Sequence, residues 1–263
     1  IYAHNGIELF VLYLVSGVIT MYVFQYFNMG WRQFVTALIV FGSVLVTFIG
    51  FRLINDGSSF TEYKLTLFLF LGSMLSVAGY PLIFLMEKIF GLVSNTRLQD
   101  LADPNNKLLR ILAQKAPGTF QHSLQVMNLS DAAARSIDAN VLLVRAGAMY
   151  HDIGKTENPQ CFVENEGVGA KYHDGLTPLE SAKMIINHVT DGMRLAEKYN
   201  LPTIISDFII THHGTSCAAY FYNKYIQEGG DPANADEFFY KGKKPWTKEQ
   251  TILMICDSIE AAS

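Results

Sequence analysis

Long apolar segments separated by short polar stretches occupy the first ninety residues of the chain. Three of these segments, at 9–27, 33–51 and 65–86, contain no acidic or basic residue. Each is close to the roughly 20 residues with which a helix crosses ~30 Å of hydrocarbon. A buried core helix would explain one such segment, but three in succession favour membrane spans. We therefore predict transmembrane helices at about 7–28, 32–52 and 64–90.

The residues that flank these segments favour one orientation in the membrane. Tyr26, Trp31 and Tyr63 lie at segment ends, as aromatic residues at a lipid interface do. Positive residues prefer the cytoplasmic side, and they follow the first and third segments: Arg32, Lys88, Arg97, Lys107 and Arg110. The pattern predicts a multi-pass plasma-membrane protein, with the lipid bilayer as a partner and residues after 90 in the cytoplasm. Because the apolar runs carry no acidic or basic residue, they resemble an anchor or a signalling element rather than a transport path.

Beyond residue 92 the apolar positions recur at helical spacing, and no alternating strand pattern is found. The chain is thus predicted to be all-α. Asp103-Pro104 is typical of a helix start, and the helix that it opens is predicted to end before Pro117. The segment 93–116 that contains it is predicted as a juxtamembrane linker helix, either a plain spacer or a signal transmitter. The domain at 117–263 is predicted to contain helices at 120–136, 138–150, 177–189 and 203–213 and from 247, with loops at 156–176 and 214–246. Capping boxes open the helices at Thr177 and Thr247.

Composition narrows the functional classes only slightly. Half of the residues are hydrophobic, 17% are charged and the net charge is −4, so nothing indicates nucleic-acid binding. Cys161, Cys217 and Cys256 are far apart in the sequence and form no Cys-x-x-Cys pair, which is typical of free thiols in a reducing compartment.

Histidines and aspartates gather near the ends of the predicted cytoplasmic helices. Each has an ordinary explanation alone, because a histidine suits a helix carboxyl end and a buried aspartate is often paired with an arginine. Five histidines and two aspartates in comparable positions make those explanations insufficient together. Imidazole and carboxylate suit first-row transition metals, and the number of groups exceeds what one ion needs. The candidates are His122, His151, Asp152, His188, His212, His213 and Asp257.

The order of these residues resembles the HD phosphohydrolase superfamily, and the extra histidines resemble its two-metal members. The surrounding stretches KAPGTFQHSLQV (115–126), HDIGK (151–155), HHGTS (212–216) and DSIEAA (257–262) are similar to the seven-transmembrane HD family of PgpH-type cyclic di-AMP phosphodiesterases. That family has seven spans and an extracellular sensor domain. We therefore expect that the amino-terminal portion is missing from this chain and that its last domain is truncated after Asp257.

The resemblance implies two divalent transition metals, iron or manganese, and hydrolysis of cyclic di-AMP to the linear dinucleotide pApA. One metal is predicted to bind His122, His151, Asp152 and Asp257. The other is predicted to bind Asp152, His188 and His212, so that Asp152 bridges ions about 3.5–4 Å apart. A water molecule whose pKa both cations lower would be the nucleophile.

Other residues are predicted to contact the substrate. Lys155 is a candidate phosphate ligand and catalytic group, although a solvated loop lysine is the alternative. His213 is open between metal ligand, substrate contact and support of a ligand, and we favour substrate contact or proton transfer. Tyr220, Phe221 and Tyr222 are candidates for stacking on bases, with simple packing as the alternative.

Three other functions are alternatives to a cyclic di-AMP phosphodiesterase. A cyclic di-GMP phosphodiesterase of the HD-GYP kind would carry glutamate after its paired histidines, where this chain has Gly214. A nucleoside triphosphate hydrolase usually needs only the four-residue mononuclear set. A non-catalytic nucleotide receptor should have lost a ligand, yet every expected position is filled. The oligomeric state is not determined by the sequence, and a homo-oligomer stays open.

Overall fold

The computed structural model describes residues 6–24, 32–55, 67–68, 71–72, 75, 85–87, 89–165 and 172–262 of the chain. The chain divides into two compact units, Ile1–Leu92 and Val93–Ser263. Each unit is described here by itself.

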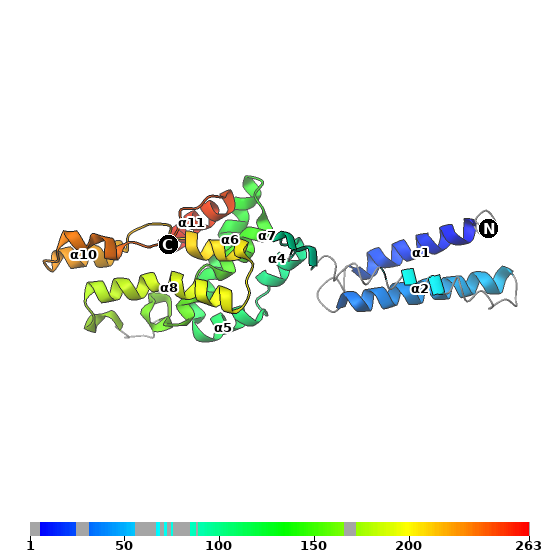
Figure 1. Cartoon of the computed structure of the whole chain (residues 1–263), viewed down its shortest axis with the longest axis horizontal. Helices are drawn as coiled ribbons and strands as arrows, with labels where there is room; N and C mark the ends of the chain where they lie inside the picture. The colour runs from blue at the N-terminus through cyan, green and yellow to red at the C-terminus, as the bar shows by residue number, and fades with distance from the viewer. Residues whose placement is uncertain are drawn as a thin grey trace. The chain divides into compact units, whose positions relative to one another are not determined.

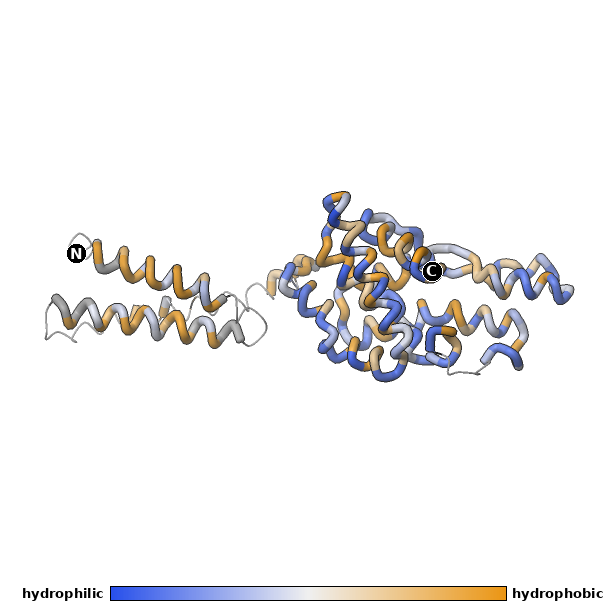
Figure 2. The backbone as a smooth tube through the Cα atoms, turned by 180° about the vertical axis from the view of Figure 1, so that it is seen from behind, coloured by the Kyte–Doolittle hydropathy of each residue, from blue (hydrophilic) through white to orange (hydrophobic). Residues whose placement is uncertain are grey.

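The first unit contains two long apolar helices, α1 (Gly6–Phe24) and α2 (Arg32–Asn55), which pack against each other. Figure 2 shows that most of the described positions of α1 are hydrophobic. Among the side chains that the structure describes here, Leu12, Val44 and Phe48 form a small buried cluster between the helices. Many large apolar side chains stay exposed instead, among them Ile7, Phe10, Tyr13 and Met21 of α1 and Val46 and Leu53 of α2.

The predicted membrane spans are not confirmed. Within the described residues, no helix combines the length and the apolar character required to cross a membrane. Helices α1 and α2 coincide with the first two predicted spans. The third, at 64–90, lies largely outside the described residues.

The second unit is all-helical, as predicted, and contains no strand in its described part beyond an isolated bridge between Cys217 and Phe239. Its longer helices are drawn in Figure 1. They are α4 (Asn95–Ala102), α5 (Lys107–Lys115), α6 (Pro117–Ser136), α7 (Val141–Tyr150), α8 (Pro178–Lys198), α9 (Thr203–Thr211), α10 (Ala219–Gln227) and α11 (Lys248–Glu260). All of them except α10 contribute buried side chains to one hydrophobic core. Short 3₁₀ helices fill the connections: η1 (Ile153–Thr156), η2 (Pro159–Cys161), η3 (Val163–Asn165), η4 (Tyr172–Gly175) and η5 (Pro232–Phe238).

The segment 93–116 forms two helices instead of one. The Asp103 carboxylate accepts a hydrogen bond from the backbone N–H of Asn105 at 2.8 Å, which makes a turn after α4. Helix α5 then begins behind Asn106, whose side chain caps Leu108 N–H. The prediction of a helix starting at Asp103-Pro104 was therefore wrong. Leu98, Leu101, Leu108, Leu109 and Leu112 of these two helices belong to the main core.

Two other predicted boundaries were wrong because packing overrides local signals. Helix α8 continues past 189 to Lys198, and its Gly192 lies where the helix approaches Ile209 and the backbone of Gly154. The predicted loop at 214–246 contains helix α10, whose Tyr222 and Tyr225 rings pack against Phe238 at centroid distances of 5.4 and 5.0 Å. Helix α10 lies against α8.

Local capping was predicted more accurately. The capping box at Thr177 is confirmed, with Glu180 as its partner. At Thr247 only half of the box forms. The Thr247 hydroxyl accepts from Gln250 N–H, whereas the Gln250 side chain accepts from Trp246 N–H. Helix α7 begins at Val141 behind an Asn140 cap, three residues later than predicted.

Candidate metal centre

Asp152 lies at the centre of the candidate site because α7 ends directly before it. Helix α7 closes at Tyr150, His151 caps it, and η1 begins at Ile153. Close approach of η1 to α8 requires glycine at 154, since an added Cβ there would lie 1.8 Å from the carbonyl oxygen of His188. This contact brings the buried Asp152 next to helices α8 and α9.

Three histidines at the ends or on the inner face of these helices share one hydrogen-bonding pattern. Each Nδ1 donates to the backbone carbonyl three residues earlier: His151 to Ala148 at 2.8 Å, His188 to Ile185 at 2.6 Å, and His212 to Ile209 at 2.8 Å. A neutral imidazole that donates through Nδ1 carries its lone pair on Nε2. The helix backbone therefore orients three Nε2 atoms as potential metal ligands.

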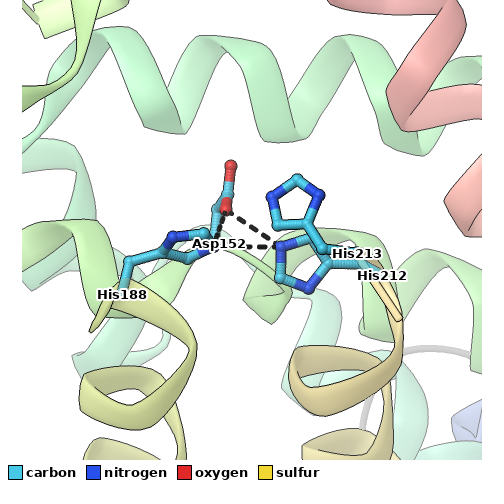
Figure 3. Close-up of side chains that lie close together, drawn as sticks. All are labelled: Asp152, His188, His212 and His213. Atoms are coloured by element: carbon cyan, nitrogen blue, oxygen red, sulfur yellow. Dashed lines mark hydrogen bonds and ion pairs between the residues drawn. The ribbon is translucent and has the colours of Figure 1, made fainter. Parts of the chain in front are cut away.

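These Nε2 atoms converge on the carboxylate of Asp152, and Figure 3 shows this arrangement for His188 and His212. Oδ1 lies 3.2 Å from His188 Nε2 and 3.4 Å from His212 Nε2. Oδ2 lies 3.4 Å from His151 Nε2 and 3.6 Å from His122 Nε2. The two carboxylate oxygens are thus divided between two groups of histidines.

Helices α6 and α11 supply the remaining residues of the group around Asp152 Oδ2, namely His122 and Asp257. Asp257 Oδ1 lies 2.9 Å from His122 Nε2 and 3.5 Å from His151 Nε2. On its other side, His122 Nδ1 lies 2.5 Å from Glu260 Oε2. His122 and Asp257, which are 135 residues apart in the sequence, therefore meet in the site.

The residues fit metal ions. His151 Nε2 and Asp152 Oδ1 are buried atoms without a hydrogen-bond partner, which would be costly unless a cation satisfied them. Two sets of side chains could each hold an ion, with ligand atoms within 4.8 Å of one another, and they share Asp152. One set is His122, His151 and Asp152, and the other is Asp152, His188, His212 and His213.

Lys155 balances the negative charge of the centre. Its Nζ lies 2.8 Å from Asp152 Oδ2 and 2.8 Å from Glu164 Oε1, with only 13% of the side chain exposed. Burial acts to lower the pKa of Lys155, but the Asp152 and Glu164 carboxylates raise it above its usual value. Lys155 is therefore a partly buried, charged residue of the site rather than a solvated loop lysine.

A cavity of about 520 Å³ opens beside the centre. Its lining includes His122, Asp152, Lys155, His213 and Asp257. The ring of His213 stacks on Tyr240 at a centroid distance of 4.3 Å. Burial and the neighbouring His212 and His188 hold the pKa of His213 well below its usual value, so this ring is neutral at physiological pH.

A second cavity, of about 450 Å³, shares Val163 and Glu164 with the first. Aromatic side chains line it, namely Phe162, Tyr172, His173, Tyr220 and Phe221. Of the three aromatic residues predicted to stack on bases, Tyr220 and Phe221 lie here. Tyr222 lines neither cavity and packs against Phe238 instead.

Sequence reasoning missed three residues of the site. Glu260 had a detectable signal, because it lies three residues after Asp257 on the same helix and so shares its face. Glu164 and Tyr240 are in segments with no regular pattern, and only the fold places them beside Lys155 and His213.

The protonation of His151 predicts how metal affinity depends on pH. Burial acts to lower its pKa, but the Asp152 carboxylate and the nearby Asp257 raise it to about 10. The metal-free ring is then protonated at neutral pH, and a metal must displace that proton. We expect apparent Mn²⁺ affinity to increase as pH rises from 6 to 9, with proton release on binding, measured by titration in weakly buffered solution. Affinity that is constant over this range would contradict the prediction.

The same shift sets the stability of the metal-free protein. The folded-state pKa of His151 is raised above the ordinary value of 6.5, so its contribution is fully present below pH 6.5. It is lost as pH rises towards 10. Chemical unfolding of metal-stripped protein at pH 6 and 9 measures this loss, and a His151→Ala variant is the control in which this component should disappear.

Comparison with known proteins identifies relatives of both the sequence and the fold. Cyclic-di-AMP phosphodiesterase PgpH of Listeria monocytogenes serotype 1/2a (strain 10403S) is 47% identical over 186 residues, which are 71% of this chain and 26% of that protein. Cyclic-di-AMP phosphodiesterase PgpH of Bacillus subtilis (strain 168) is 37% identical over 256 residues, 96% of this chain and 36% of that protein. The chain thus spans about a quarter to a third of the length of these relatives.

A solved structure agrees with the sequence comparison. The L. monocytogenes PgpH HD domain in complex with cyclic di-AMP aligns with a TM-score of 0.58 and 46% identity, covering 61% of this chain and 74% of that one. The HD domain profile matches residues 119–262, which contain every ligand candidate described above. The chain therefore belongs to the HD domain family.

Proposed function

We propose that this chain is the catalytic part of a metal-dependent phosphodiesterase that hydrolyses cyclic di-AMP to pApA. The observation that carries the proposal is the division of the Asp152 carboxylate between two histidine groups beside a 520 Å³ cavity. Two related proteins named cyclic-di-AMP phosphodiesterase, and a related domain that binds this nucleotide, support the choice of substrate.

Two ligand sets would hold two divalent ions, iron or manganese. His122, His151, Asp152 and Asp257 form the first set. Asp152, His188 and His212 form the second, and His213 lies within reach of it. When bound, such ions stabilise negative charge on a phosphodiester and lower the pKa of water.

The other residues of the cavity would orient the substrate and handle protons. The Lys155 ammonium, 2.8 Å from Asp152 Oδ2, keeps that carboxylate ionised and adds positive charge to a cavity whose lining includes four acidic residues, Asp152, Glu164, Asp257 and Glu260. A neutral His213 can accept a hydrogen bond from the substrate, and its contact with the Tyr240 ring restricts its orientation.

The aromatic cavity supports a nucleotide as the substrate class. It adjoins the catalytic cavity through Val163 and Glu164, so a phosphate in one places a base near the other. Bases stack on aromatic rings at about 1–3 kcal/mol each. Tyr220, which is 72% exposed, and Phe221 are the proposed stacking residues.

Turnover of a panel of cyclic dinucleotides tests the proposal. The purified protein, reconstituted with Mn²⁺ or Fe²⁺, should convert cyclic di-AMP to pApA faster than it converts cyclic di-GMP, with products resolved by chromatography. Faster turnover of cyclic di-GMP would favour the rival specificity. Tight nucleotide binding without hydrolysis, at any metal loading, would favour a receptor.

We also propose that the first unit anchors the domain to the plasma membrane with residues after 90 in the cytoplasm. The support is the apolar surface of α1 and α2, where many of the large side chains that the structure describes are exposed. The protein should stay in the membrane fraction after carbonate washing and leave it in detergent. A reporter fused after residue 263 should be active only in the cytoplasm, and activity on the opposite side would reject the orientation.

A further inference from the structure

His122 differs from three other histidines of the centre, His151, His188 and His212, in the group that its Nδ1 contacts. His151, His188 and His212 each donate to a backbone carbonyl of their own helix. His122 instead meets a side chain, because its Nδ1 lies 2.5 Å from Oε2 of Glu260. Its orientation therefore depends on a carboxylate that comes from another helix, 138 residues later in the chain.

Helix α11 contacts both nitrogens of the His122 ring. Asp257 and Glu260 are three residues apart and so lie on one face of the helix. Asp257 Oδ1 lies 2.9 Å from Nε2, while Glu260 Oε2 contacts Nδ1. The side chains of His122 and Glu260 are 12% and 16% exposed, so the contact is shielded from much of the solvent.

We infer that Glu260 is a positioning residue for His122. Its carboxylate accepts the Nδ1 proton, which leaves the Nε2 lone pair directed at the set that contains His151, Asp152 and Asp257. A carboxylate behind a ligating imidazole also makes that imidazole a stronger ligand than a carbonyl does. Glu260 thus supports the first ligand set alone, since His188 and His212 depend on backbone carbonyls. This inference rests on the metal-dependent function proposed above.

Site-specific metal affinity tests the inference. The metal-stripped 263-residue chain is titrated with Mn²⁺, and electron paramagnetic resonance separates bound from free ion. Glu260→Ala should lower the affinity for one of the two bound ions by about 10–100-fold and leave the affinity for the other at its wild-type value. In a His188→Ala background, which impairs the second set, adding Glu260→Ala should remove most of the remaining Mn²⁺ binding.

Matched variants distinguish an effect on the orientation of His122 from an effect on the folding of the protein. Ser258→Ala changes an exposed residue on the same helix, whose hydroxyl donates to Met254 O. This variant should bind Mn²⁺ as the wild type does. If Glu260→Ala does not fold, Glu260→Gln replaces it, because glutamine keeps the shape and removes the charge. A lower affinity for one of the two Mn²⁺ ions in the Glu260→Gln variant supports the inference. Two ions at wild-type affinity in the folded variant, or equal weakening of both, would overturn it.

The experiment is independent of the substrate. It uses no nucleotide, so a wild-type protein that binds two Mn²⁺ but does not cleave cyclic di-AMP would refute the proposed function and leave the role of Glu260 testable.

Discussion

Replacing Asp152 with alanine should remove or greatly weaken both bound metals and reduce hydrolysis by about 10³-fold or more. The physical reason is the division of its carboxylate: Oδ1 faces His188 and His212, and Oδ2 faces His151, His122 and Lys155. Alanine would take one ligand from each set, so both sets would hold an ion less tightly. Losing several kcal/mol of transition-state stabilisation corresponds to that factor in rate.

The comparison variant for this prediction is His188→Ala. It removes a ligand from one set alone, so it should retain roughly one metal per chain while losing most of its activity, because the proposed hydrolysis would use both ions. Metal analysis of the purified variants decides between the outcomes. Asp131→Ala, which removes a partly exposed aspartate paired with Arg135, should keep both metals. The bridging role is wrong if Asp152→Ala keeps two metals, or if His188→Ala empties both sites equally.

A Gly154→Ala variant should lose both stability and activity. The added Cβ would lie 1.8 Å from the carbonyl oxygen of His188 and 2.5 Å from the backbone nitrogen of Gly192. Both neighbours are backbone atoms of α8, so no side-chain rotation can relieve the overlap. The 3₁₀ helix η1 must move away from α8, which costs about 1–3 kcal/mol or more. Asp152, two residues earlier, would be displaced from His188 Nε2, now 3.2 Å from its Oδ1.

Thermal unfolding and metal content together test this prediction. Gly175→Ala is the matched control, because an added Cβ there meets nothing within 4 Å. The control should unfold at the wild-type temperature and bind metal normally. A Gly154→Ala protein with wild-type unfolding temperature and metal content would show that the contact between η1 and α8 is not what positions Asp152.

The sequence alone named the candidate ligands because histidines and aspartates recur near the ends of predicted helices, in motifs that resemble the HD family. Histidine at the carboxyl end of a helix finds the carbonyl three residues earlier without help from the rest of the fold, as His151 and His212 do. The all-α class and the Thr177 capping box followed from periodicity and from contacts within four residues. Each ligand candidate could therefore be named before its neighbours in space were known.

Helix boundaries were less predictable because packing decides them. Gly192 lies within α8 where the helix approaches Gly154, and nothing nearby in the sequence shows that neighbour. Helix α10 forms where Tyr222 and Tyr225 can pack on Phe238. Leu109 and Leu112 place the segment after the apolar region within the main core, although the same pattern also suited a spacer.

The partners of charged groups were decided only by the tertiary structure. Lys155 was a candidate phosphate ligand in the sequence, and the fold places its ammonium between Asp152 and Glu164. His122 was a candidate ligand, and the fold adds Glu260 behind it. Helices α6 and α11 meet only after the chain between them has packed. The sequence thus determined which groups could bind metal, and tertiary packing determined the geometry that orients them, since an ion pair depends on distances that only packing sets.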